Sequence, residues 1–169
     1  MSSFRRSPST SQAAIAIGVA ALVITVLAWP LLFSKAYFDV DWLMHLWYLW
    51  HQSHAIGASG LPSLFVHYSH SVYYPEYAFY GGTLYALAGT LSLVLGDAPL
   101  QAYILTYCIG FACAYGGWYW IARTVGLGRW RAHAPGFLFV TSACYLTAVY
   151  GRGDWPEFTA GGKATARRH

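Results

Sequence analysis

Charged residues are scarce in this chain. Only 9% of its 169 residues are Asp, Glu, Lys or Arg, whereas a water-soluble domain has about a quarter. In contrast, 57% of the residues are hydrophobic and 18% are aromatic. Sixteen charges (ten basic, six acidic) cannot cover a soluble globule of this size, and a disordered chain would contain more charge and fewer aromatics. The composition therefore excludes both classes and indicates a protein of the lipid bilayer.

Asparagine is absent and cysteine is rare. Without asparagine the chain has no N-linked glycan acceptor. Cys108, Cys113 and Cys144 lie in apolar runs that lack the paired spacing of a disulfide framework or a zinc site. We expect them to be small side chains of the core.

Four apolar runs occur, at residues 12–33, 80–96, 102–122 and 133–150. A membrane-spanning helix needs about 20 such residues. The first run follows Arg5 and Arg6, as in a signal peptide, but it is longer than the apolar core of a signal, which has about 7–15 residues. Residues 12–33 therefore predict a retained span, preceded by a cytoplasmic tail at residues 1–11.

The distribution of charge favours three spans over four. No Lys or Arg occurs between Lys35 and Arg123, whereas four acidic residues do. If residues 80–96 crossed the membrane, the basic turn after residue 122 would lie outside, against the positive-inside rule. We therefore expect an all-α integral membrane protein, with spans at about 12–33, 102–122 and 133–150. Residues 82–95 then form an interfacial helix, and a four-span topology is the alternative.

A second interfacial helix is predicted at residues 40–54. Its polar residues recur at helical spacing on one face, with the apolar residues opposite, which suits a helix resting on lipid headgroups. The polar residues are Asp41, His45, Tyr48 and Gln52, and the apolar ones are Leu43, Leu46, Trp47 and Trp50. The three tryptophans of the segment also match the aromatic belt of a membrane interface.

Asp41 and His45 are four residues apart on that polar face. A carboxylate and an imidazole at this spacing could share a proton for general-base work or bind a divalent cation. They could equally satisfy each other as a structural pair. Asp39 is the competing acid. Four further imidazoles follow, which suggests either a metal-binding tract or polar anchors at the interface; they are His51, His54, His67 and His70.

Two later segments carry polar or aromatic clusters. Residues 73–80 place five aromatics around Glu76, and such a cluster forms an interfacial girdle or stacks on a sugar or a polyprenyl chain. Beyond the last apolar run, Arg152 and Asp154 could hold a phosphate and a cation, or could cap the end of a helix.

The order of these pieces resembles the start of a GT-C membrane glycosyltransferase, in particular the bacterial membrane proteins labelled as related to 6-pyruvoyl-tetrahydropterin synthase. The resemblance covers about residues 13–158. Its elements are a first span followed by Phe38-Asp39-Val40-Asp41, an interfacial helix with His45, and a Gly60-Leu61-Pro62 turn. An aromatic run ending Phe79-Tyr80-Gly81-Gly82, a basic turn Gly126-Leu127-Gly128-Arg129 and the stretch Tyr150-Gly151-Arg152-Gly153-Asp154 complete it.

The resemblance implies a location in the bacterial cytoplasmic membrane, a polyprenyl-phosphate sugar donor and an acidic residue of the first external loop in the active site. By that resemblance Asp41, or else Asp39, is the general base or metal ligand, with His45, Arg152 and Asp154 contacting the substrate. Such enzymes continue through more spans, whereas here residues 159–169 form an unrelated, unstructured basic tail. The expectation is therefore a fragment, inactive alone. The alternative is a small non-catalytic membrane subunit. Neither hypothesis involves nucleic acid.

Overall fold

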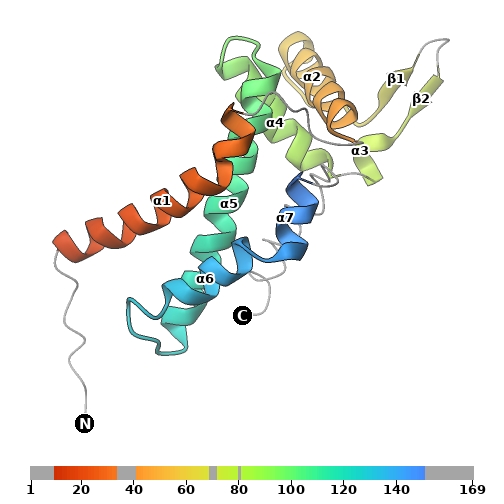
Figure 1. Cartoon of the computed structure of the whole chain (residues 1–169). Helices are drawn as coiled ribbons and strands as arrows, with labels where there is room; N and C mark the ends of the chain where they lie inside the picture. The colour runs from red at the N-terminus through yellow and green to blue at the C-terminus, as the bar shows by residue number, and fades with distance from the viewer. Residues whose placement is uncertain (1–9, 34–40, 69–71, 80, 151–169) are drawn as a thin grey trace.

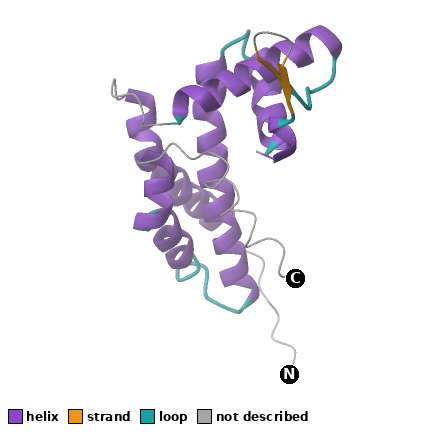
Figure 2. Ribbon diagram, turned by 90° about the vertical axis from the view of Figure 1, so that its right-hand side faces the viewer, coloured by secondary structure: helices purple, strands orange, loops and turns teal. Residues whose placement is uncertain are grey.

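The computed structural model describes residues 10–33, 41–68, 72–79 and 81–150. Within these ranges the chain forms seven helices, α1 to α7, and one short hairpin, β1–β2. The predicted helical fold class is confirmed, and the hairpin is an addition that the sequence did not predict. Figure 1 shows the longest helix, α5, at the centre, with α2 and α4 towards one end and α6 at the other. Figure 2, turned by 90°, shows that helices make up most of the described chain.

Helix α1 (Thr10–Phe33) is the most apolar helix of the described chain. Its stretch Ala14–Phe33 has a mean hydropathy of 2.5, and only 11% of it is buried. Ala28 and Leu31 are its buried side chains among those described, and both lie towards the end where α1 packs against α5. Of the described helices, α1 alone is both long and apolar enough to cross a membrane.

Helices α2 (Trp42–Ser59) and α4 (Gly82–Val94) pack closely against each other. Gly89 of α4 makes this possible, because a Cβ atom there would lie 2.9 Å from the backbone nitrogen of Ser53 and 3.0 Å from Cβ of Gln52. Real Cβ atoms do not approach other atoms so closely, since close-packed interiors leave no room for overlap. The glycine therefore sets the separation of the two helices.

The predicted orientation of α2 is wrong. Its polar face does not face solvent but packs inwards, so that His45, Gln52 and Ser53 are buried. The apolar face is exposed instead. An amphipathic pattern distinguishes two faces of a helix without saying which is covered, and the small residues of α4 give the polar face a close partner. The helices at residues 40–54 and 82–95 are confirmed as helices, at 42–59 and 82–94.

The chain leaves α2 through a turn that is tied back to the helix. Gly60 has φ +75° and ends α2 in the left-handed conformation that glycine adopts without strain. Beyond it, the Gln52 amide bonds both backbone groups of Ser63: Nε2 donates to the carbonyl at 2.7 Å, and Oε1 accepts from the N–H at 2.9 Å. Strands β1 (Val66–Tyr68) and β2 (Val72–Tyr74) then pair antiparallel, with Val66 opposite Tyr74, before the single turn α3 (Glu76–Phe79).

Helix α5 (Pro99–Thr124) confirms the helix predicted at residues 102–122 and extends it at both ends. Pro99 occupies the first turn, where its missing N–H costs nothing. The helix contacts α1, α2, α4 and α6. Its tyrosines and glycines make it less apolar than α1, and it does not reach the hydropathy at which α1 stands out.

The apolar run at residues 133–150 is not one continuous helix, contrary to the prediction. It forms α6 (His133–Val140) and α7 (Ala143–Tyr150), separated by Thr141 and Ser142. The Ser142 hydroxyl accepts a hydrogen bond from the Tyr145 N–H at 3.3 Å, as a helix N-cap does, and Thr141 Oγ1 donates to the carbonyl of Phe137 at 2.7 Å. These two hydroxyl groups provide local partners that allow the helix to stop and restart.

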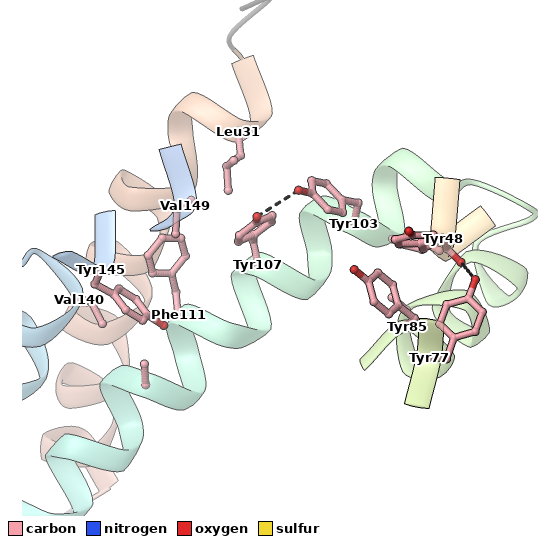
Figure 3. Close-up of a cluster of buried hydrophobic side chains, with 14 of the residues drawn as sticks. Leu31, Tyr48, Tyr77, Tyr85, Tyr103, Tyr107, Phe111, Val140, Tyr145 and Val149 are labelled. Carbon is pink, nitrogen blue, oxygen red and sulfur yellow. Dashed lines mark hydrogen bonds between the residues drawn. The ribbon is translucent and has the colours of Figure 1, made fainter. Parts of the chain in front are cut away.

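The core is rich in tyrosine rather than in leucine. The large buried rings line α5 and the helices beside it (Figure 3); they are Tyr48, Tyr77, Tyr85, Tyr103, Tyr107, Phe111, Tyr115 and Tyr145. Buried phenols need hydrogen-bond partners, and Tyr103 and Tyr107 meet at 3.1 Å between their hydroxyl oxygens. The expectation that the cysteines lie in the core is wrong, because Cys113 and Cys144 are exposed and Cys108 is only partly buried. Small size permits burial of a cysteine but does not require it.

Candidate functional site

Asp41 lies at the N-cap of α2, immediately after the segment that follows α1. Its backbone carbonyl accepts the His45 N–H at 3.0 Å, which closes the first turn of the helix. The side chain makes no capping hydrogen bond and is partly exposed. An N-cap aspartate ordinarily uses its carboxylate to bind the N–H groups of the first turn. Here the carboxylate is not used for capping and stays accessible.

His45 lies one turn further along α2 and points into the protein, with an exposed fraction of 5%. Its Nδ1 shares a hydrogen bond with the hydroxyl of Tyr85, which α4 supplies from forty residues away. The two rings are nearly parallel, with centroids 6.0 Å apart. When the phenol donates, the ring proton of a neutral His45 stays on Nε2. Tyr85 therefore helps to hold the imidazole in its orientation.

Three buried tyrosines pack against one another beside His45. Tyr48, Tyr77 and Tyr85 come from α2, α3 and α4, and their ring centroids are 5.6–5.9 Å apart at steep angles. The Tyr77 hydroxyl donates to the backbone carbonyl of Tyr48 at 2.9 Å and lies 3.1 Å from Nδ1 of His51. Figure 3 shows Tyr48, Tyr77 and Tyr85 gathered at one end of the tyrosine-rich core. The aromatic cluster thus holds α3 against α2 at Tyr48.

The geometry separates the predicted site residues into two groups. Asp41 and His45 lie one turn apart at the start of α2, as the spacing predicted. Asp39, Arg152 and Asp154 lie outside the described residues. Of the four histidines, His51 contacts Tyr77, and His54 is exposed with Nδ1 3.0 Å from the carbonyl of Trp50; His67 is in β1, and His70 is outside the described residues. In the described ranges, no three His, Cys, Asp or Glu side chains gather as ligands for a metal ion.

A comparison with protein-family models, with curated proteins and with solved structures finds no match for this chain. The function is therefore argued from the site itself.

Sequence reasoning missed Tyr85, which is the partner of His45. The available signal was the stripe formed by Tyr85, Ala88, Gly89 and Ser92 along α4, all of which are buried. Small residues at this spacing are typical of a helix that another helix approaches closely. The stripe identifies a packing face, but nothing in the sequence pairs that face with the polar side of α2.

Chemically, the start of α2 combines an accessible carboxylate with an imidazole of fixed orientation. The carboxylate can accept a proton from a hydroxyl group or share a divalent cation with a second acid. The helix N-terminus also carries a partial positive charge, which favours an anion beside it. These properties suit a reaction in which a hydroxyl attacks next to a phosphate.

Proposed function

We propose that this chain is part of a GT-C-type membrane glycosyltransferase that takes its sugar from a polyprenyl phosphate. Asp41 is the catalytic base, with Asp39 as the competing acid, and Arg152 and Asp154 contact the substrate. The substrate contact expected of His45 is not part of the proposal, because His45 is buried against Tyr85. The observation that carries the proposal is the Asp41 carboxylate, which is accessible, unused in capping and one turn before a buried histidine. The resemblance of the sequence to GT-C enzymes supplies the reaction class.

In the proposed reaction, a hydroxyl of the acceptor attacks the anomeric carbon of the sugar. The bond between that carbon and the phosphate oxygen breaks, and the polyprenyl phosphate leaves with the bonding electron pair. Asp41 takes the proton of the attacking hydroxyl. A carboxylate in this role accelerates a reaction by roughly 10²–10⁴-fold. A divalent cation held between Asp41 and Asp39 is compatible with the same chemistry.

The proposal includes three membrane crossings in the bacterial cytoplasmic membrane, namely α1, α5 and the α6–α7 pair. The 26 residues of α5 are long enough, since a span needs about 20. The hydroxyl groups of Thr141 and Ser142 satisfy backbone groups at the break between α6 and α7, which a broken helix requires within a membrane. Helix α4 has only 13 residues, about 20 Å of helix, and this length disfavours a fourth crossing.

The experiment compares Asp41→Asn with a matched control in a transfer assay. Because the chain is expected to be inactive alone, the substitutions are made in the whole transferase of which it is part. Membranes that contain this transferase receive a radiolabelled polyprenyl-phosphate sugar, and the label released from the lipid is counted. We expect Asp41→Asn to lower the rate by roughly 10²–10⁴-fold. Asp97→Asn makes the same chemical change at an exposed turn with φ +62°, where asparagine is tolerated, and we expect it to leave the rate unchanged.

Asp39→Asn is the second arm of this experiment. If it abolishes transfer while Asp41→Asn does not, the base is Asp39. Transfer that survives both substitutions, or no release of label by the unmodified transferase, contradicts the proposal. The second candidate function, a non-catalytic membrane subunit, then takes precedence. The deep burial of His45 among tyrosines favours that candidate, because a satisfied interior histidine needs no catalytic role.

A further inference from the structure

A second histidine joins two helices at the end of α5 that lies opposite to the candidate site (Figure 1). His133 is the first residue of α6, and its Nδ1 lies 2.8 Å from the hydroxyl of Tyr115 on α5. Its Nε2 is buried and has no hydrogen-bond partner in the described part of the chain. The proposed transfer reaction makes no use of this imidazole.

Aromatic rings surround the imidazole of His133. The centroid of its ring lies 4.7 Å from that of Tyr119 and 6.0 Å from those of Tyr115 and Trp130. Beside this cluster the two helices approach closely, because a Cβ on Gly136 would lie 2.8 Å from the Tyr115 carbonyl oxygen. The imidazole is therefore part of the contact that joins α6 to α5.

The described part of this contact is short of hydrogen-bond acceptors. Trp118 of α5 packs against Phe139 of α6, with ring centroids 5.5 Å apart, and its Nε1 is also buried without a partner. An indole N–H can only donate, and a buried donor ordinarily takes any acceptor within reach. Two unpaired nitrogens in one helix pair therefore indicate that the described residues there supply no acceptor for a further N–H.

The groups around His133 give little compensation for a positive charge. Phenols face it from α5, and arginines follow on α5 and on the turn that leads into α6; they are Tyr115, Tyr119, Arg123, Arg129 and Arg131. The phenols are neutral near pH 7, and the arginines are cations. From α7, Tyr145 contacts Phe139, at the other end of α6. The aromatic faces attract a cation, but this attraction is weaker than the loss of hydration of a buried charge.

We propose that protonation of His133 weakens the packing of α6 against α5, so that this helix contact responds to pH. In the neutral ring one nitrogen carries a proton, and either tautomer can bond the Tyr115 hydroxyl. In the protonated ring both nitrogens are donors, and Nε2 then holds a charged N–H that lacks an acceptor. His133 lies beside the exposed Arg131, so that N–H reaches water when the helices separate. The proposal does not rest on the catalytic role of Asp41.

Proton linkage sets the sign and the size of the effect. An imidazole in water is half protonated at about pH 6.5. If only the separated or unfolded state takes up the proton, the unfolding equilibrium constant rises roughly tenfold between about pH 7.5 and about pH 5.5. The contribution of His133 to stability is therefore present above this range and is lost as the pH falls through it.

The experiment compares the unmodified full chain with His133→Asn in detergent micelles. Asparagine does not titrate and places a polar atom near the position of Nδ1, where Tyr115 can bond it. Denaturant-induced unfolding is followed by helical circular dichroism. We expect acidification from about pH 7.5 to about pH 5.5 to raise the unfolding constant roughly tenfold more in the unmodified chain than in His133→Asn. The effects of the other histidines cancel in this comparison.

The matched control is His54→Asn, which removes an exposed imidazole from α2. It should keep the pH dependence of the unmodified chain. An equal pH dependence in the unmodified chain and in His133→Asn overturns the proposal. Stabilisation by acid that disappears in His133→Asn also overturns it, because an acidic partner of Nε2 would have that effect.

Hydrogen exchange of the unmodified chain gives a second test that needs no folded variant. The exchange rates of the α6 amides, divided by their intrinsic rates at each pH, report how often this helix opens. We expect the opening constant of α6 to rise roughly tenfold over the same pH range. Helix α1 contains no histidine and serves as the internal control. An opening constant of α6 that rises no more than that of α1 overturns the proposal.

Discussion

The α2–α4 pair and the α5–α6 pair lie towards opposite ends of α5. Each pair is joined by a histidine–tyrosine hydrogen bond and by a glycine that packs against the backbone of the other helix. In the first pair, His45 bonds Tyr85, and Gly89 brings the helices together. In the second pair, Nδ1 of His133 lies 2.8 Å from the hydroxyl of Tyr115. Gly136 faces the backbone there, because a Cβ on it would lie 2.8 Å from the Tyr115 carbonyl oxygen.

The two pairs differ in how completely the histidine is surrounded. His45 is buried within a cluster of tyrosines. His133 is only partly buried, and its Nε2 has no hydrogen-bond partner within the described part of the chain. The same local device therefore serves two purposes: in α2–α4 it fixes a side chain beside the candidate base, and in α5–α6 it supports a basic, exposed turn.

Adding a methyl group to either glycine should have the largest effect. Gly89→Ala and Gly136→Ala each force a Cβ against backbone atoms that cannot move aside, and we expect each to lower the free energy of unfolding by about 1–3 kcal/mol. The measurement is denaturant-induced unfolding of the chain in detergent micelles, followed by helical circular dichroism.

The control is Gly116→Ala on the exposed side of α5, where no atom lies within 4 Å of the new Cβ. We expect this change to be neutral or stabilising by up to about 1 kcal/mol, because alanine has the higher helix propensity. Equal destabilisation by all three substitutions would show that close approach is not what Gly89 and Gly136 provide.

Removing the phenol oxygens should distinguish the two pairs. Tyr85→Phe leaves the buried His45 without its Nδ1 partner, and we expect it to destabilise the fold by about 1–3 kcal/mol. Tyr115→Phe should cost less than about 1 kcal/mol, because His133 is less buried than His45 and the lost hydrogen bond leaves a smaller desolvation penalty. The same unfolding measurement applies, and a larger loss for Tyr115→Phe would reverse the comparison.

Single cysteines near the two helix pairs should have the smallest effect on stability, and they report on which side of the membrane each pair lies. Leu61 is 70% exposed beyond α2, and Gly128 lies in the α5–α6 turn. In a background without the native cysteines, we expect an impermeant maleimide added outside cells to label Leu61→Cys but not Gly128→Cys. External labelling of Gly128→Cys would contradict the three-crossing topology and favour four crossings.

The sequence predicted the helices that composition alone defines. An uninterrupted apolar run predicted α1, and the apolar run at residues 102–122 predicted α5. The break within residues 133–150 was missed because Thr141 and Ser142 are weakly polar and lie among apolar neighbours. Serine at the start of a helix is nevertheless an N-cap signal, and here it outweighs the continuity of the run.

The sequence predicted only those parts of the candidate site that are formed by residues close together in the chain. Asp41 and His45 are neighbours on one helix, so their spacing was sufficient to place them together. Tyr85 approaches His45 from a separate helix, and that contact depends on how α4 packs against α2. The inward orientation of the polar face depends on the same packing. Helical periodicity carries no information about either.

The amide of Gln52 has a consequence for how this protein can vary. It makes two hydrogen bonds to the Ser63 backbone, at 2.7 and 2.9 Å, and so binds both the N–H and the carbonyl of that residue, as a neighbouring β-strand would. One residue added or removed between them would displace the Ser63 backbone by about 3.3 Å, beyond hydrogen-bond reach. Leu61 and Pro62 are exposed and can change identity. We therefore expect the turn to tolerate substitutions at Leu61 and Pro62 but not an insertion or a deletion.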